Sequence, residues 1–241
     1  MAEHSDRVAR PRPAPKAGRP AGRTATVAPM ANPAAPGGAR RPAGRAERSA
    51  ARRADILAAA LEEFAACGFA AARLDDVARR AGVAKGTIYL YFQDKQALFE
   101  ELVRAMLVPH IAAVEALPAE GPVRPVVEAF LAHIVHDVLS TRLADVIRLV
   151  IAEGPRFPAL AEFYYREVVS RALAVLDRLL ARGVASGEIG NPALVHFPQL
   201  VVAPVLMGLI WGGMFQRFAP LDVAALMRAH LDILFASGRA A

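Results

Sequence analysis

The chain has 241 residues, of which 55% are hydrophobic and 22% are charged. Such a length and apolar content allow one large or two small domains with a sizeable core. The single cysteine, Cys67, excludes an intrachain disulfide and a cysteine-based zinc site, and we expect it to pack rather than to react. A reducing, cytoplasmic setting fits this composition, and the basic N-terminus lacks the apolar stretch of a signal peptide.

Residues 1–48 form a basic segment rich in proline, alanine and arginine. They contain ten basic and three acidic residues, so this segment holds the positive excess behind the net charge of +6. With eight prolines and almost no large apolar residues, they cannot bury enough surface to offset the entropy of ordering. We therefore expect a disordered tail, which is either simply solvated or adds non-specific contacts to phosphates.

From residue 49 onward, apolar residues recur at helical spacing, and no alternating strand pattern or internal repeat is present. The pattern predicts an all-α fold. Gly68 is expected to end a first helix, and Asp94 to cap a longer helix that bends near Pro109. The expected helices after the first are 74–81, 85–91, 94–117, 126–140, 142–153, 159–182, 193–218 and 222–237. We place domain boundaries at 49–104 and 105–241.

The stretch from 74 to 92, LDDVARRAGVAKGTIYLYF, has the plan of a helix-turn-helix. Gly82 suits the left-handed conformation that ends the first short helix. Val83 and Ile88 are expected to anchor the turn and the second helix. Lys, Tyr and Thr side chains can then contact phosphates or bases, and Gly allows close approach. The residues left to face outward are Lys85, Gly86, Thr87, Tyr89 and Tyr91.

Residues 52–104 resemble the DNA-binding domain of the TetR/AcrR transcriptional regulators. The resemblance rests on ILAAALEEFAACGFAAARLDDVARRAGVAKGTIYLYFQDKQALFEEL, including the run AGVAKGTIYLYF. It implies an N-terminal three-helix helix-turn-helix domain followed by a larger helical domain for ligand binding and dimerisation. It also implies that Lys85, Gly86 and Thr87 lie near bases or phosphates in the major groove. Tyr89 and Tyr91 would contact the DNA backbone, and Lys95 would hold a phosphate.

This sequence departs from the family at the starts of the two short helices. The family often has a hydroxyl residue there, which caps the helix and touches a phosphate. Here the first short helix is preceded by Ala72 and Arg73, and the second by Ala84. Each missing cap costs about 1 kcal/mol. Arg73 is the candidate for a charged phosphate contact in place of the neutral one.

Residues 197–215, FPQLVVAPVLMGLIWGGMF, form an uncharged stretch long enough to span a membrane. The prolines, Gln199 and the glycines make it a poor continuous span. We interpret it as a helix buried between its own domain and a partner subunit, with Gly208 and Gly212 permitting close approach of helices. A second dimer helix is expected over 222–235. Its apolar contacts would come from Leu226, Leu231 and Leu234.

The effector pocket is expected to be mostly apolar with a few polar groups. The second domain offers such a mixture, although each member is equally suited to an ordinary core or surface position. The bulky side chains indicate a bulky apolar or aromatic ligand. The candidates are Phe130, His133, Asp137, Arg148, Phe163, Tyr164, Met207 and Trp211.

No metal, cofactor or enzyme activity is expected. His133, His136 and Asp137 lie within two helical turns, but no further histidine is nearby and the one cysteine is distant. No phosphate-binding loop, nucleophile elbow or paired-carboxylate motif is present in the sequence.

The sequence therefore indicates a cytoplasmic, ligand-responsive, homodimeric repressor of a palindromic DNA operator. A membrane-associated interaction protein anchored by residues 197–215 is the alternative from a different class. A regulator that activates, or that needs no ligand, is the third interpretation.

Overall fold

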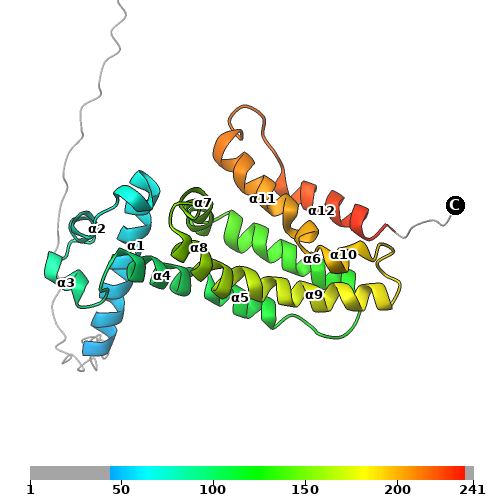
Figure 1. Ribbon diagram of the computed structural model, residues 1–241, viewed down its shortest axis with the longest axis horizontal. Helices are drawn as coiled ribbons and strands as arrows, with labels where there is room; N and C mark the ends of the chain where they lie inside the picture. The colour runs from blue at the N-terminus through cyan, green and yellow to red at the C-terminus, as the bar shows by residue number, and fades with distance from the viewer. Residues whose placement is uncertain (1–43, 237–241) are drawn as a thin grey trace, which may run out of the picture. The chain divides into compact units, whose positions relative to one another are not determined.

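The computed structural model describes residues 44–236, and every regular element in this range is helical, which confirms the all-α class (Figure 1). Two of the elements are short π-helices, η1 and η2. In chain order the elements are α1 (Arg45–Ala71), α2 (Leu74–Arg80), α3 (Lys85–Tyr89), α4 (Lys95–Met106), α5 (Val108–Glu115), α6 (Val123–His133), η1 (Ile134–Leu139), α7 (Leu143–Glu153), α8 (Pro158–Tyr164), η2 (Tyr165–Val169), α9 (Ser170–Ala185), α10 (Ala193–His196), α11 (Gln199–Met214) and α12 (Val223–Leu234).

Helix α1 begins four residues earlier than expected, at Arg45. The backbone N–H of Gly44 donates to the Glu47 carboxylate at 2.8 Å, which satisfies one of the free donors at this end. Residues 45–48 are thus helical, which corrects the end of the predicted tail. The rest of that tail, residues 1–43, lies outside the described residues. At its other end α1 is interrupted at Gly68, whose φ of 77° is left-handed.

The first hydrophobic core joins α1, α2, α3 and α4. Phe69 packs against Phe64 at 5.6 Å and against Phe99 at 5.8 Å between ring centroids, and all three rings are buried. Phe69 also meets Phe157, which precedes α8, edge-on at 5.0 Å. This core therefore continues from the helix-turn-helix domain into α7 and α8.

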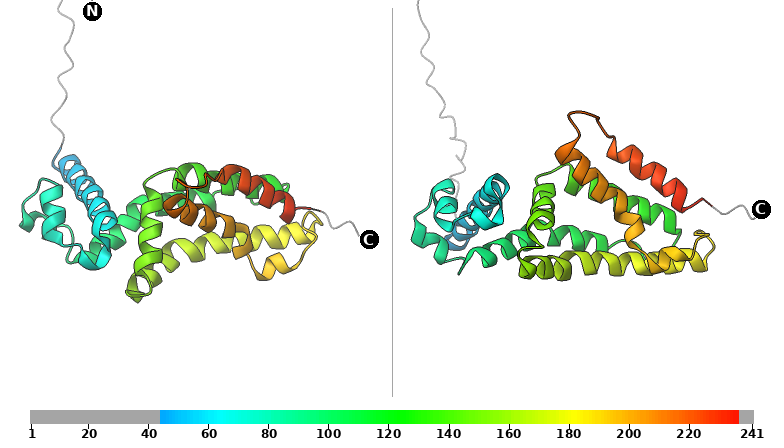
Figure 2. Two further views of the ribbon diagram at one scale, coloured as in Figure 1. Left: turned by 90° about the horizontal axis from the view of Figure 1, so that it is seen from above. Right: turned by 45° about the horizontal axis from the view of Figure 1, so that its top comes forward.

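The second core lies among the helices of the larger domain. Helices α6 and α9 run side by side, α5 packs on α9, and α12 covers α6 (Figures 1 and 2). Buried apolar side chains from these helices and from α10 and α11 fill the space between them. Helices α11 and α12 pack against each other. The C-terminal end of α11 lies near the N-terminal end of α12, at the loop that connects them (Figure 2).

Four predicted helices are divided, and one of them, 193–218, forms α10 and α11. The expected helix 94–117 forms α4 and α5, with Pro109 in the first turn of α5, where its missing N–H costs nothing. The expected helices 126–140 and 159–182 each contain π-helical turns, η1 and η2. Asp94 caps α4 as predicted, because its carboxylate accepts the Ala97 N–H at 2.8 Å.

The uncharged stretch 197–215 forms one 16-residue helix, α11, which starts only after Pro198. Spanning a bilayer takes about 20 apolar residues. Among residues 44–236 no helix is both long and apolar enough to cross a membrane.

Candidate nucleic-acid interface, dimer surface and ligand cleft

The turn between α2 and α3 holds α3, the reading helix that is expected to enter the major groove, against the first hydrophobic core. Gly82 adopts φ 65°, and the Val83 N–H donates to the Ala78 carbonyl at 3.0 Å. Ile88, in the middle of α3, is fully buried. A helix of five residues has little stability of its own, so this anchor and the turn determine its orientation.

The opposite face of α3 is open to solvent. Lys85 and Gly86 are exposed, Tyr89 is 48% exposed and Leu90 is 82% exposed. Thr87 is half-buried. Leu90 is not among the predicted contact residues, because an apolar residue close to Ile88 in the sequence is typical of a buried position. Its exposure at the end of α3 makes it a candidate for apolar contact with a thymine methyl.

Acidic residues beside this face are paired rather than free. Lys85 Nζ lies 2.8 Å from Asp75 Oδ2, and Arg79 Nη2 lies 2.6 Å from Asp76 Oδ1. The hydrogen bond that Lys85 donates to the Asp75 carboxylate raises the pKa of Lys85. Arg73 is exposed at the N-terminal end of α2, where no side chain caps the helix. The pairs partly neutralise the carboxylates that would otherwise repel DNA.

Tyr91 connects two helices. Its hydroxyl lies 3.1 Å from Ser49 Oγ on α1, and its ring packs near Phe92 at 6.3 Å between centroids. Tyr91 is half-buried, unlike Tyr89. In the free protein its contacts therefore join the end of α3 to α1.

The contacts of Lys95 differ from the phosphate contact that the family resemblance implies. Its Nζ donates to the carbonyls of Phe69, Ala70 and Ala72 at 2.5, 2.9 and 3.1 Å. It also lies 4.6 Å from the centroid of the Phe69 ring, and burial lowers its pKa. The break at Gly68 leaves these carbonyls without helical partners, and Lys95 satisfies them. All three ammonium protons are used, so none is left for a phosphate in the free protein.

A chain of ion pairs joins α2 to the larger domain. One oxygen of Glu62, on α1, lies 3.3 Å from Arg142 just before α7, and the other lies 3.4 Å from Arg80 on α2. Arg80 also contacts Glu63 at 3.0 Å. Helices α1 and α7 pack directly against each other. These residues therefore connect α7 to α2 by way of α1.

Helix α11 has two apolar faces. Val201, Val205, Gly208 and Leu209 are buried within the chain. The opposite face is exposed, and the adjacent α12 also exposes Ala229 and Ile233, of which Ile233 is 73% exposed. Such an apolar surface on a helix pair is typical of a protein–protein interface. On α11 this outer face consists of Leu200, Ala203, Leu206, Met207, Ile210 and Met214.

The structure corrects several predicted dimer residues. A Cβ on Gly208 would lie 2.8 Å from Val223, so this glycine permits close packing of α11 on α12 within one chain. Leu231 is buried in the second core, and Leu226 and Leu234 pack against that core. Gly212 is exposed and its nearest neighbour is Arg148. Gly208 and the three leucines thus pack within the chain, whereas the exposed apolar surface comes from other positions.

The predicted effector residues do not meet around one cavity. Phe130 and Phe163 are buried core residues, and burial raises the pKa of Tyr164 to about 12. Met207 is 49% exposed on the outer face of α11. Trp211 Nε1 donates to the Ala219 carbonyl at 2.6 Å. Composition alone could not distinguish core aromatics from pocket aromatics.

The polar members of that predicted set are already paired. Arg148 contacts Asp145 at 2.9 Å and donates to the Leu209 carbonyl at 3.4 Å, which links α7 to α11. His133 lies 2.7 Å from Asp137 and 3.3 Å from the ring of His110. No group of three metal-ligating residues occurs within residues 44–236.

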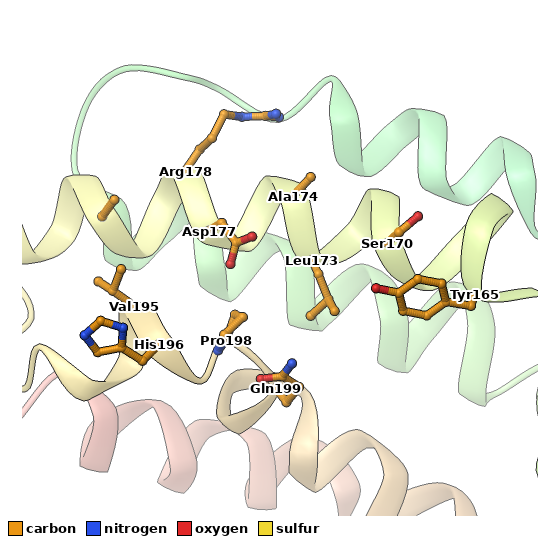
Figure 3. A pocket seen from close by; sticks show the side chains of 11 residues that line it. Tyr165, Ser170, Leu173, Ala174, Asp177, Arg178, Val195, His196, Pro198 and Gln199 are labelled. Carbon is orange, nitrogen blue, oxygen red and sulfur yellow. The ribbon is translucent and has the colours of Figure 1, made fainter. Parts of the chain in front are cut away.

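An open cleft of about 780 Å³ lies between α9 and the segment that runs from α10 into α11 (Figure 3). Leu173 and Asp177 extend into it from α9, and His196 and Gln199 approach from the other side (Figure 3). Tyr165 lies at one end. None of these cleft residues is in the predicted pocket. Most of them are polar, and polar residues on a predicted helix are usually interpreted as solvent-facing surface.

A helix-turn-helix with its reading helix anchored on one side and open on the other defines a DNA-binding regulator. Comparison with known proteins agrees. Residues 56–102 match the model of bacterial regulatory proteins of the tetR family, and residues 117–231 match the tetracyclin repressor-like C-terminal domain. The chain belongs to the TetR family of transcriptional regulators.

Similar proteins are regulators as well. The chain is 28% identical over 183 residues to the fatty acid metabolism regulator protein of Bacillus subtilis, covering 74% of this chain and 91% of that one. It is 28% identical over 188 residues to the regulator SrpR of Pseudomonas putida, covering 78% and 83%. The crystal structure of Bacillus subtilis FadR with stearoyl-CoA has a TM-score of 0.60 at 23% identity, covering 76% and 98%, and supports the fold.

Proposed function

We propose that the protein is a homodimeric repressor that binds a palindromic operator and releases it when a bulky small molecule binds the larger domain. The observation that carries this proposal is the arrangement of α3. Its exposed face presents side chains that can contact bases and phosphates, and its inner face is held in place by the buried Ile88. A regulator that binds chromosomal DNA would act in the cytoplasm, and the proposed function includes no enzymatic step.

The proposed DNA contacts follow from exposure. Lys85, Gly86 and Tyr89 would face the major groove and its phosphates, with Leu90 as an apolar contact and Arg73 on the flanking backbone. Lys85 would exchange its Asp75 partner for a phosphate. Thr87 and Tyr91 are half-buried, so their predicted contacts require small rearrangements. The basic segment 1–43 would add salt-dependent affinity without sequence preference.

The proposed dimer uses the outer face of α11 and the adjoining part of α12. Two copies related by a two-fold axis would cover the same apolar face on each other. The same symmetry would place two α3 helices about one DNA turn apart, so that the operator is a palindrome.

The proposed release depends on differential affinity. An effector that binds better to one arrangement of the larger domain shifts the population of that arrangement. The packing of α7 on α1, together with the Arg142–Glu62–Arg80 ion pairs, provides the physical link to α2. We retain 49–104 and 105–241 as functional domain limits, with the α1 N-terminus extended to Arg45.

Selection from randomised duplex DNA tests the proposal. Residues 1–241 and residues 44–241 would be purified and incubated with the library at near-physiological salt. We expect both to enrich the same palindrome, with the longer chain binding more tightly. Recovery of no motif by either protein would contradict the proposal, and binding by the longer chain alone would assign it to the basic segment.

A further inference from the structure

The cleft between α9 and α10–α11 contains polar groups that the chain itself leaves unpaired. The side chains of Asp177, His196 and Gln199 make no hydrogen bond or ion pair to any residue between 44 and 236, nor does the Tyr165 hydroxyl. Their counterparts elsewhere on the described surface are commonly paired, as Asp75 is with Lys85. A cavity of about 780 Å³ is in the range of small-molecule sites.

The charge that faces this cleft is negative. The Asp177 carboxylate extends from α9 toward His196 and Gln199, whereas the side chain of its neighbour Arg178 points to the other side of α9 (Figure 3). Arg178 shares a separate small pocket with Glu115. Arg171, which hydrogen-bonds Glu115, and to a lesser degree Arg178 lower the pKa of that carboxyl. Arg178 also lines the cleft, but its side chain points away from Asp177, so Asp177 is the charged side chain that extends between α9 and His196 (Figure 3).

The rest of the cleft lining can contact the apolar part of a ligand. Leu173 and Val195 supply half-buried apolar surface, and the ring of Tyr165 is 57% exposed at one end. An aromatic face attracts a cation through its ring quadrupole, and a carboxylate does so through direct charge. The amide of Gln199 adds a hydrogen-bonding group without charge.

We propose that this cleft binds a lipophilic organic cation, with Asp177 as the counter-charge and Tyr165 as the aromatic contact. The inference rests on the proposed function only where it names this cation as the effector. Binding itself is measurable without DNA.

Two probes of the same shape and opposite charge test the proposal: tetraphenylphosphonium and tetraphenylborate. Their affinities for the full chain would be measured by isothermal titration calorimetry. We expect the phosphonium to bind at least about tenfold more tightly than the borate, since the charge at Asp177 attracts one and repels the other. Equal affinities, or preference for the borate, would overturn the proposal.

Variants locate the site. Asp177→Asn keeps the shape and should weaken phosphonium binding by about fivefold, the upper range for an exposed ion pair. Tyr165→Leu keeps apolar bulk and should weaken it by about threefold. Glu162→Gln, which changes an exposed carboxylate on α8 outside the cleft, should change nothing. An Asp177→Asn protein with wild-type affinity would remove the cleft from consideration.

Operator binding separates this inference from the proposed function. Phosphonium binding that depends on Asp177 but leaves operator affinity unchanged would support the site and contradict its role as the effector site. Loss of operator binding on adding phosphonium, with Asp177→Asn resistant, would support both. A protein that selects no operator yet binds phosphonium through Asp177 would contradict the proposed function and leave the site standing.

Discussion

At the scale of single residues, the clearest departure from expectation is Lys95. The family resemblance implies a phosphate contact, but the side chain instead satisfies three carbonyls at the end of α1. The need for this contact arises from Gly68, where a left-handed residue breaks the helix. No pattern within the sequence near residue 95 reveals those carbonyls, because they lie more than twenty positions earlier along the chain.

Replacing Lys95 by Ala distinguishes the two roles. Because the carbonyls lose their partner, we expect the free energy of unfolding to fall by about 1–2 kcal/mol. The salt dependence of operator binding should keep its slope, since no phosphate contact is lost. Urea denaturation and a salt titration of binding measure the two effects. An unchanged stability with a slope smaller by about one ion would restore the phosphate role.

Tyr89 has the opposite profile. It is 48% exposed on α3, and no hydrogen bond to its hydroxyl occurs within the described range. Tyr89→Ala should therefore weaken operator binding by about tenfold through loss of one backbone contact and its packing. Its melting temperature should remain within about 2 °C of the wild type. Ile151→Ala, which changes a 47% exposed residue of α7 outside every proposed site, is the matched control, and an equal loss of binding in both would contradict the assignment.

At the scale of elements, the helices were predictable from periodicity, but of their interruptions only those at Gly68 and near Pro109 were. Apolar spacing located all the long helices, and Asp94 identified the start of α4. The π-helical turns of η1 and η2 leave no composition signal, because they depend on how neighbouring helices pack. Glycine in α11 was recognised as a site of close approach, but the sequence could not tell that Gly208 meets Val223 of its own chain.

The outer face of α11 supplies the test at this scale. Ile210 is 43% exposed there, so Ile210→Glu leaves the folded chain intact and places a charge in the proposed interface. We expect light scattering to show the mass of one chain, 25.7 kDa, where the wild type shows twice that mass. Operator affinity should fall with it. Ala129→Glu, on an exposed position of α6, serves as the control, and a dimeric Ile210→Glu protein would place the interface elsewhere.

At the scale of the whole molecule, the proposed function depends on three surfaces: the outward face of α3, the apolar face of α11 and α12, and the cleft beside α9. The resemblance in residues 52–104 identified the first from motif residues alone. The second and third needed the folded chain, because both are made by residues whose neighbours come from other helices. In a symmetric dimer, an effector would act by changing the distance between the two α3 helices.

The most direct measurement of the central claim is operator affinity as a function of the spacing between half-sites. Base pairs would be inserted at the centre of the selected palindrome, and binding of the wild-type dimer would be followed by fluorescence anisotropy. Inserting about 5 base pairs puts the half-sites on opposite faces of the duplex. The account predicts that this insertion reduces affinity to the non-specific level. Unchanged affinity at every spacing would show that each chain binds alone, and would contradict a dimer with two fixed reading helices.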